Sequence, residues 1–344
     1  ERSLALCCTL RTMNATTVNR IRTCLSRAVP LHVKQGHHRP NHHPSQRQRR
    51  LLHTVALTRQ LPNSFDRALS EHYHNGIDED TFSLTKARQQ LDTYISEMKT
   101  ILPTVVLPPL EEYPDSCFVE DTVIAIGNRA LLTHPGHESR QGEVESIGQV
   151  LRDELGMEVV KMNPDNQTFP AYCDGGDVLF TGRHLFVGVS ERTNEDALAR
   201  IEAVFPHVPL IPVAPVAQGK YVLHLKSLVT HLDETTLLLP TDPMGYKVFR
   251  AMRGPELGYE AIYLPDILSC NAVVIELGDK SDTTKKVALV QDSTCETTRQ
   301  RLQEACEERN MELRFVNTSE LAKKDAALTC CSVLLDVADE YVPK

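Results

Sequence analysis

The chain has 344 residues, of which 41% are apolar and 24% charged, and its formal net charge is −9. These are globular values, and the sequence has no run of about 18 apolar residues that would predict a membrane span. Ten of the 37 basic residues but only one acid, Glu1, lie in residues 1–50, which leaves 27 basic against 45 acidic residues in 51–344. An acidic body argues against a nucleic-acid partner and is compatible with a cationic substrate.

Residues 1–50 form a basic extension with its own composition. Val33 to Arg50 is rich in His, Pro, Gln and Arg and has no apolar period, which predicts disorder. From Met13 onward, arginines with Ser and Thr resemble a mitochondrial presequence, although an incidental tail is the favoured interpretation. We expect no signal peptide, and the ten cysteines contain no Cys-x-x-Cys pair, which is typical of a reducing compartment. The expected location is cytoplasmic, or mitochondrial if the extension is a presequence.

Residues 51–344 are predicted to form a single domain, an α/β fold with five copies of a ββαβ pattern. Each copy has a strand, a hairpin partner, an amphipathic helix and a closing strand, and the closing strands recur about every 50 residues. The first copy is clear only from its helix onward. Apolar residues three and four apart between Leu84 and Leu102 predict that helix, and Val105–Leu107 closes the copy.

The other four copies are predicted in full. In the second, the strands are Cys117–Ile126, Ala130–Thr133 and Met157–Met162, with a helix over about residues 141–155. In the third, they are Val178–Phe180, Leu185–Val189 and Leu210–Val213, and a Thr193-x-x-Asp196 capping box opens the helix. The fourth has Val222–Val229, Thr236–Leu239 and Ile262–Leu264, and the fifth has Ala272–Leu277, Val287–Val290 and Leu313–Val316. One additional strand, Leu328–Leu335, follows the fifth copy.

Three reactive residue types lie at or near the starts of first strands or in the additional strand. Cys330 offers a thiol, His224 a base and Asp174 a carboxylate to orient that base, and these are the parts of a nucleophilic cysteine site. Five copies arranged in a ring would bring such segments to one centre. Side chains alternate along a strand, so only one of Cys330 and Cys331 can face the site. Taken alone, His224 is better explained as a core histidine, and a turn residue is the alternative explanation of Asp174.

Five motifs occur in a fixed order: Pro114–Asp121, Asp174–Arg183, Ser190–Asn194, Leu223–Ser227 and Leu328–Leu334. Together they resemble the pentein, or guanidine-modifying, superfamily, and within it the dimethylarginine dimethylaminohydrolase family. The resemblance covers roughly Leu61 to Leu335. It implies a five-fold pseudo-symmetric ββαβ propeller with a central site. Lys324 stands where the family often has an apolar residue.

The resemblance also implies roles for ten residues. Cys330 would be the nucleophile, His224 the general acid and base, and Asp174 its orienting carboxylate. The guanidinium would be bound by Asp115, Glu120 and Asp121. The substrate's α-carboxylate would be bound by Arg140 and Arg192, and its α-amine by the Leu69 backbone and Asp325.

The implied reaction converts asymmetric dimethylarginine or monomethylarginine to citrulline and an alkylamine, through a covalent thiouronium on the cysteine. The partner is therefore a small molecule, with no nucleic acid or membrane involved, and the protein would be a monomer or homodimer. No cofactor and no metal are required. Zinc could bind Cys330 and His224 as an inhibitor, because a thiolate and an imidazole are good zinc ligands.

Three other functions stay open from the sequence. An arginine or agmatine deiminase would use the same three catalytic residues, although agmatine lacks the carboxylate that two arginines would bind. A non-catalytic binding module with the same fold would need no Cys or His. A general cysteine hydrolase, such as an amidase, leaves the acidic residues unexplained.

Overall fold

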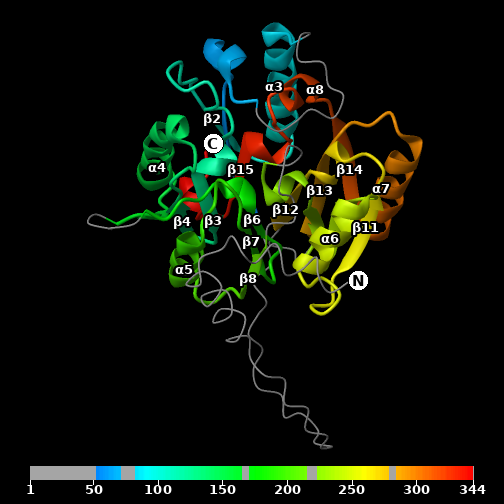
Figure 1. The fold of residues 1–344 in the computed structure, drawn as a ribbon. Helices are drawn as coiled ribbons and strands as arrows, with labels where there is room; N and C mark the ends of the chain where they lie inside the picture. Colours follow the sequence, from blue (N-terminus) through cyan, green and yellow to red (C-terminus); the bar gives the residue numbers. More distant parts are fainter. Residues whose placement is uncertain (1–51, 71–81, 165–169, 215–222, 279–283, 344) are drawn as a thin grey trace, which may run out of the picture. The chain divides into compact units, whose positions relative to one another are not determined.

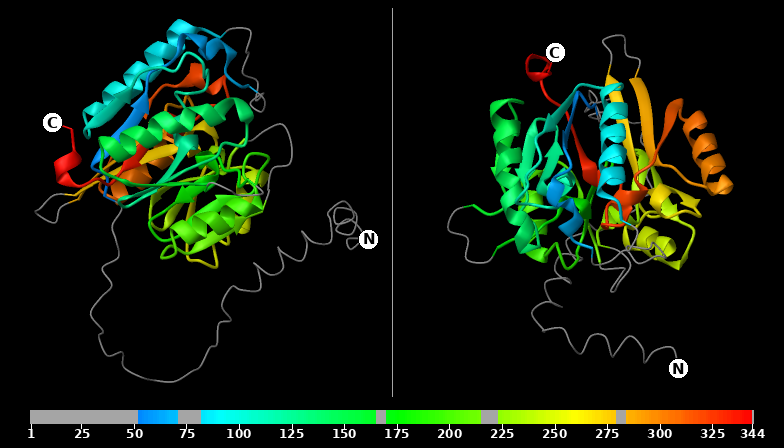
Figure 2. Two further views of the ribbon diagram at one scale, coloured as in Figure 1. Left: turned by 90° about the vertical axis from the view of Figure 1, so that its left-hand side faces the viewer. Right: turned by 90° about the horizontal axis from the view of Figure 1, so that it is seen from above.

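A computed structural model describes residues 52–70, 82–164, 170–214, 223–278 and 284–343. The chain divides into two compact units, Glu1–Gln48 and Arg49–Lys344, and all the described residues lie in the second. The predicted disorder of residues 1–50 falls outside the described part. Within the second unit, helices lie around the outside and strands toward the middle (Figures 1 and 2). None of the described helices is long and apolar enough to cross a membrane.

The described strands form five three-stranded sheets. In spatial order they are β15 (Ser332–Leu335), β1 (Val55–Arg59) and β2 (Thr104–Leu107); β3 (Val123–Ile126), β4 (Arg129–Leu132) and β5 (Glu158–Lys161); β6 (Val178–Phe180), β7 (Leu185–Gly188) and β8 (Leu210–Val213); β9 (Thr230–Asp233), β10 (Thr236–Pro240) and β11 (Glu260–Leu264); β12 (Ala272–Gly278), β13 (Thr284–Gln291) and β14 (Met311–Val316). In every sheet the first two strands are antiparallel, and the third is parallel to the second.

A helix connects the second and third strands of each sheet, as a parallel crossover requires. These helices are α3 (Leu84–Lys99), α4 (Val144–Asp153), α5 (Glu195–Val204), α6 (Pro243–Ala251) and α7 (Glu296–Glu308). A short helix, α8 (Ser319–Ala322), follows β14. The prediction of five ββαβ copies is therefore confirmed.

The first copy obtains its missing strand from the other end of the chain. The strand predicted as an addition to the fifth copy is β15, which pairs antiparallel with β1 so that Thr58 lies opposite Ser332. Its register continues to Val55 opposite Leu335. β15 thus completes the first sheet, and among the described residues each copy has three strands.

Five apolar clusters fill the junctions between neighbouring sheets and close the ring. Neighbouring residues of a strand point to opposite faces, so they enter different clusters. In β4, Leu131 packs toward the third sheet and Leu132 toward the first. In the first sheet, Ala56 packs toward the fifth sheet and Leu57 toward the second. Each sheet is therefore apolar on both faces, and burial between neighbours replaces one central core.

The starts of the first strands differ from the prediction in a way that shapes the site. Each first strand is preceded by a 3₁₀ turn: η3 (Val119–Thr122), η5 (Gly175–Asp177), η6 (Leu225–Ser227), η7 (Leu268–Cys270) and η8 (Thr329–Cys331). The continuous strands predicted for Cys117–Ile126 and Leu328–Leu335 are wrong over their first halves. The strand predicted for Val222–Val229 is wrong over all its described residues, since β9 begins only at Thr230. These turns hold or directly follow Asp121, Asp174, His224 and Cys330. The described residues also contain the 3₁₀ turns η1 (Asn63–Arg67), η4 (Glu138–Glu143) and η9 (Asp339–Tyr341).

Candidate active site

One pocket at the centre of the described residues gathers nine of the ten predicted site residues; Glu120 is not among them. It is lined by Leu69, Asp115, Phe118, Asp121, Arg140, Asp174, Arg192, Leu223, His224, Lys324, Asp325 and Cys330. Its cavity volume is about 20 Å³, which is about the space that one water molecule needs. A substrate as large as arginine therefore has to displace side chains to enter.

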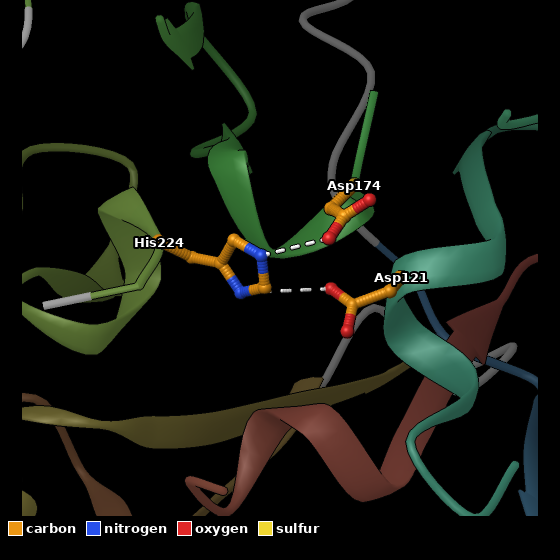
Figure 3. Close-up of side chains that lie close together, drawn as sticks. All are labelled: Asp121, Asp174 and His224. Carbon is orange, nitrogen blue, oxygen red and sulfur yellow. Dashed lines mark hydrogen bonds and ion pairs between the residues drawn. The ribbon is translucent and has the colours of Figure 1, made fainter. Parts of the chain in front are cut away.

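His224 is held by Asp174. The imidazole Nε2 lies 3.0 Å from Asp174 Oδ2, and the backbone N–H of Gly136 donates to Asp174 Oδ1 at 2.8 Å (Figure 3). Both side chains are almost fully buried. Neither of the two glycines after Asp174 has a positive φ, so backbone conformation does not explain them. They are needed because other groups of the site lie too close for a side chain. A Cβ on Gly176 would lie 2.5 Å from His224 Nδ1, and one on Gly175 would lie 2.0 Å from the Glu120 carbonyl oxygen.

Asp121 is the second carboxylate beside His224. Its Oδ1 lies 3.8 Å from His224 Nδ1 and accepts from the Gly176 N–H at 2.9 Å (Figure 3). Burial alone would lower the pKa of His224, but Asp121, Asp174 and Asp177 outweigh it and raise the pKa to about 9. Burial alone would raise the pKa of Asp121, but His224 and Arg140 lower it to about 2. At neutral pH the imidazole is therefore an imidazolium.

Arg140 reaches Asp121 from the opposite side. Its Nη1 donates to Asp121 Oδ2 at 2.5 Å, and its Nε and Nη2 donate to the Glu143 carboxylate at 3.2 and 2.8 Å. Its Nη2 also donates to the carbonyl oxygen of Phe118 at 3.0 Å. Burial raises the pKa of Glu143 to about 7 against the opposing effect of Arg140. Arg140 lines the pocket, but much of its guanidinium is already bonded to protein acids.

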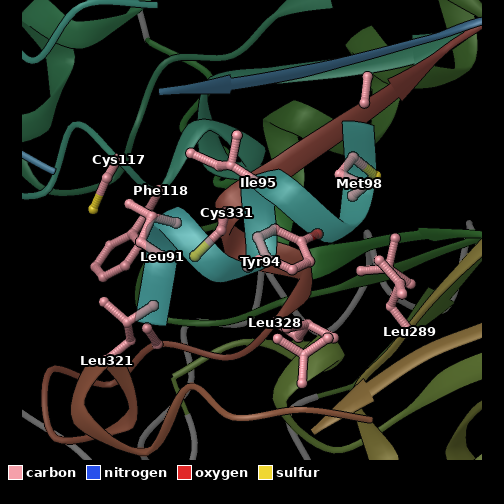
Figure 4. Close-up of a cluster of buried hydrophobic side chains, with 14 of the residues drawn as sticks. Leu91, Tyr94, Ile95, Met98, Cys117, Phe118, Leu289, Leu321, Leu328 and Cys331 are labelled. Carbon is pink, nitrogen blue, oxygen red and sulfur yellow. The ribbon is translucent and has the colours of Figure 1, made fainter. Parts of the chain in front are cut away.

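Cys330 lies in η8 and is partly exposed, whereas Cys331 is fully buried. Cys331 points into the apolar cluster around Leu91 and Tyr94 of α3 (Figure 4). The N–H of Ala327 donates to Cys330 Sγ at 3.4 Å. Burial, followed by the nearby Glu120 and Asp121, raises the pKa of Cys330 well above its usual value. In the free protein Cys330 is therefore a neutral thiol.

Glu120 lies behind the pocket and not on its lining. Its Oε1 accepts from Lys226 Nζ at 2.6 Å, and its Oε2 accepts from Thr329 Oγ1 at 2.9 Å. It lines a second cavity of about 170 Å³, whose walls include residues from the first strands of all five sheets. The expected contact of Glu120 with a guanidinium therefore requires this pairing to change.

The residues predicted around the substrate's amino and carboxylate groups lie together. The Leu69 N–H donates to Asp115 Oδ1 at 3.1 Å. Arg192 is 6% exposed and its backbone packs against Gly136, where a Cβ would lie 2.5 Å from Arg192 Cα. Asp325 has a φ of +54°, a strained conformation for a residue with a side chain.

Asn271 is a supporting residue that no sequence motif indicated. It directly follows η7 and is 2% exposed. Its Oδ1 accepts from the Thr329 N–H at 2.8 Å, and its Nδ2 donates to Thr329 Oγ1 and to the Lys226 carbonyl oxygen, both at 3.0 Å. Asn271 thereby ties the turn of Cys330 to the turn of His224. Phe118 and Leu223 also line the pocket, although only their motifs were singled out.

Asp121, Asp174 and His224 each offer one atom within 4.8 Å of the others, which is a spacing that a metal ion could bridge. The hydrogen bond and charge pairing described above account for the same arrangement. Zinc binding by Cys330 and His224 stays a prediction.

The chain is similar to known proteins in sequence and in structure. The sequence model of the family described as N,N dimethylarginine dimethylhydrolase, eukaryotic, matches residues 64–309. The N(G),N(G)-dimethylarginine dimethylaminohydrolase of Pseudomonas aeruginosa is 28% identical over 249 residues, which are 72% of this chain and 88% of that protein. The structure of the P. aeruginosa enzyme, a cysteine-to-serine mutant complexed with citrulline, has a TM-score of 0.65 at 23% identity and covers 83% of this chain and 100% of its own.

A second solved structure is similar to the same extent. The N-terminal domain of the cyanobacterial arginine dihydrolase ArgZ, bound to its substrate, has a TM-score of 0.64 at 19% identity, covering 82% of this chain and 99% of that one. The fold and the site thus define a pentein hydrolase that acts on guanidino carbon–nitrogen bonds. The chain belongs to the eukaryotic N,N dimethylarginine dimethylhydrolase family. The family match ends at residue 309, so Asp325 and Cys330 lie beyond it.

Proposed function

We propose that the protein hydrolyses asymmetric dimethylarginine and monomethylarginine to citrulline and an alkylamine. One observation carries the proposal: the thiol of Cys330 opens on the same pocket as the His224 imidazole, which two carboxylates keep protonated. An imidazolium can give a proton to a leaving amine, and a thiol can form the covalent intermediate.

The charges that line the pocket fit a methylated arginine. Asp115 and Asp121 are acids, and carboxylates pair with the planar guanidinium through directed hydrogen bonds. Arg192 and Asp325 line the same pocket and have charges opposite to those of an amino acid's carboxylate and amine. Arg140 supports recognition mainly through Asp121 in this proposal.

In the first half of the reaction, the bound cation beside Sγ favours the thiolate, and the thiol proton leaves to solvent. The thiolate attacks the guanidine carbon, so a sulfur–carbon bond forms while the carbon–nitrogen π electrons move to nitrogen. His224 then gives its proton to the methylated nitrogen. The carbon–nitrogen bond breaks, and the alkylamine leaves.

In the second half, a thiouronium remains on Cys330 and His224 is neutral. His224 takes a proton from water, and the hydroxide adds to the thiouronium carbon. Collapse of this species breaks the sulfur–carbon bond and forms the carbonyl of citrulline, and the hydroxyl proton passes to the departing sulfur, which regenerates the Cys330 thiol. Asp121 and Asp174 stabilise the imidazolium that forms again.

A deiminase acting on unmethylated arginine is the second candidate. The similarity to an arginine dihydrolase and the small cavity favour it, since arginine has no methyl groups to accommodate. Agmatine fits less well, because it has no carboxylate for Arg192. A non-catalytic module would not need Cys330, His224 and Asp174 on one pocket.

Release of the ureido product by the purified protein tests the proposal, in parallel on asymmetric dimethylarginine and arginine, which give citrulline, and on agmatine, which gives N-carbamoylputrescine, with Cys330→Ser as the matched control. We expect turnover of the methylated substrate that is abolished in Cys330→Ser. Turnover of arginine alone would support the deiminase. No turnover by folded protein in a reducing, chelated buffer would contradict both enzyme functions.

We also propose a cytoplasmic location for a protein that is a monomer or homodimer, with residues 1–50 as an extension outside the catalytic domain. A mitochondrial location applies if that extension is a presequence. Cell fractionation of the full chain and of a chain lacking residues 1–50 separates the two locations.

A further inference from the structure

A third carboxylate near His224, that of Asp177, has no part in the reaction proposed above. It is 1% exposed and lies in η5, three residues after Asp174. Its Oδ1 accepts from the Leu225 N–H at 3.0 Å. Its Oδ2 accepts from Ser190 Oγ and from Thr193 Oγ1, both at 2.6 Å. Three donors therefore converge on one buried carboxylate.

Neighbouring backbone N–H groups fix the direction in which the Ser190 and Thr193 hydroxyls donate. Ser190 Oγ accepts from the N–H groups of Arg192 and Thr193, at 3.0 and 3.1 Å. Thr193 Oγ1 accepts from the Asp174 N–H at 3.2 Å. Each hydroxyl thus receives backbone hydrogens, and its own proton is directed to Asp177. Short hydrogen bonds of this kind are typical of an ionised acceptor.

The three hydrogen bonds to Asp177 connect the segment that carries His224 with the loop that carries Arg192. Leu225 directly follows His224, so the bond to its N–H fixes the backbone that carries the imidazole. The bond to Ser190 reaches the backbone of Arg192, and Thr193 reaches that of Asp174. The packing leaves little room for adjustment, since a Cβ on Gly188 would lie 3.0 Å from Asp177 Oδ1 and 3.1 Å from Leu225 Cβ.

We propose that Asp177 is a positioning residue that sets the His224 backbone and the Arg192 loop relative to each other. Proton transfer and recognition of the substrate's carboxylate then both depend on a residue that touches neither substrate nor the reacting atoms. The inference rests on the proposed function of the same site.

The test compares Asp177→Asn with Asp266→Asn. Asp266 is a matched control, because its carboxylate accepts from one backbone N–H, that of Leu268 at 3.1 Å, and from one hydroxyl, Ser293 Oγ at 2.6 Å. It does not line the reaction pocket. Asparagine has only one accepting oxygen, so in Asp177→Asn either the two hydroxyls or the Leu225 N–H lose their acceptor, and the link between the Arg192 loop and the His224 backbone is broken. The readouts are kcat and KM for asymmetric dimethylarginine, together with the melting temperature.

We expect Asp177→Asn to lower kcat about tenfold or more and to raise KM, and Asp266→Asn to change neither by more than about twofold. Ser190→Ala removes only the hydrogen bond through which Asp177 reaches the Arg192 backbone, so we expect it to raise KM with little change in kcat. Equal kinetic behaviour of the two asparagine variants would overturn the inference. If Asp177→Asn does not fold, Ser190→Ala and Thr193→Val take its place, and unchanged kcat and KM in both would overturn it. Absence of turnover in the unmodified protein would instead count against the proposed function, and the same comparison would then be made on arginine.

Discussion

Asp121 lies between two cations, with Oδ2 bonded to Arg140 Nη1 and Oδ1 3.8 Å from His224 Nδ1. The same carboxylate also lines the pocket. Arg140 is in turn fixed by Glu143, so a buried chain of alternating charges ends at the imidazole. The state of His224 therefore depends on Arg140, although the two residues do not touch in this chain of contacts.

Arg140→Met is expected to destabilise the protein and to lower activity. It leaves Glu143 buried without its cation and Asp121 with only His224, and a broken buried pair costs about 3–5 kcal/mol. Arg129→Met is the control, since the Arg129–Glu158 pair is exposed on both sides and such pairs contribute about 0–1 kcal/mol. Urea unfolding of both variants measures the difference. Similar losses in the two would show that the buried chain contributes little.

Cys330 and Cys331 are expected to respond oppositely to substitution. Cys330→Ser should lower kcat by about 10³-fold or more, because the nucleophile is lost. Cys331→Ala should keep kcat within about twofold and cost about 1 kcal/mol of stability, because Cys331 lies in the apolar cluster of α3. Steady-state citrulline assays and thermal unfolding separate the two. Loss of activity in Cys331→Ala with a normal melting temperature would reverse the assignment.

The stabilising effect of His224 is expected to fade as pH rises. Its pKa is raised from 6.5 to about 9, so protonated His224 stabilises the fold fully below pH 6.5 and loses this effect as pH rises through about 9. The shift corresponds to roughly 3 kcal/mol at most. Urea unfolding of the protein and of His224→Gln at pH 6 and pH 9.5 tests this. A difference between them that stays constant or grows with pH would contradict the assigned charge state.

Asn271→Ala is expected to lower kcat as well as stability. It leaves the Thr329 N–H without its acceptor, which costs about 1–3 kcal/mol, and frees the turn that carries Cys330. Asp242→Ala is a control of similar cost, about 1 kcal/mol, because it removes the N-cap of α6 away from the pocket. If both variants keep full kcat, Asn271 serves stability alone.

The sequence predicts the bounds of some strands correctly, but it misses the 3₁₀ turns that hold or follow the site residues. Val178–Phe180 and Leu210–Val213 have the predicted bounds. The run Leu328–Leu335 is mainly apolar and includes the β-branched Thr329 and Val333, so composition gives no sign that its first residues form a 3₁₀ turn. Its partner strand β1 lies some 270 residues earlier, beyond any local pattern.

Other misses arise from contacts made across the fold. Thr193 was predicted to cap α5, but Asn194 is the cap and accepts from the Ala197 N–H. The Thr193 hydroxyl is taken by Asp177 and Asp174 instead. Asn271 has no local signal, because all its partners lie in other copies. The pairing of Arg140 with two acids is likewise invisible in a one-dimensional motif.

Mass spectrometry of the protein, acid-quenched during turnover of asymmetric dimethylarginine, is the decisive test of Cys330 as the nucleophile. We expect a covalent adduct that peptide mapping places on Cys330, that is absent in Cys330→Ser and that persists in Cys331→Ala. An adduct on Cys331, or citrulline formation by Cys330→Ser at the unmodified rate, would contradict it.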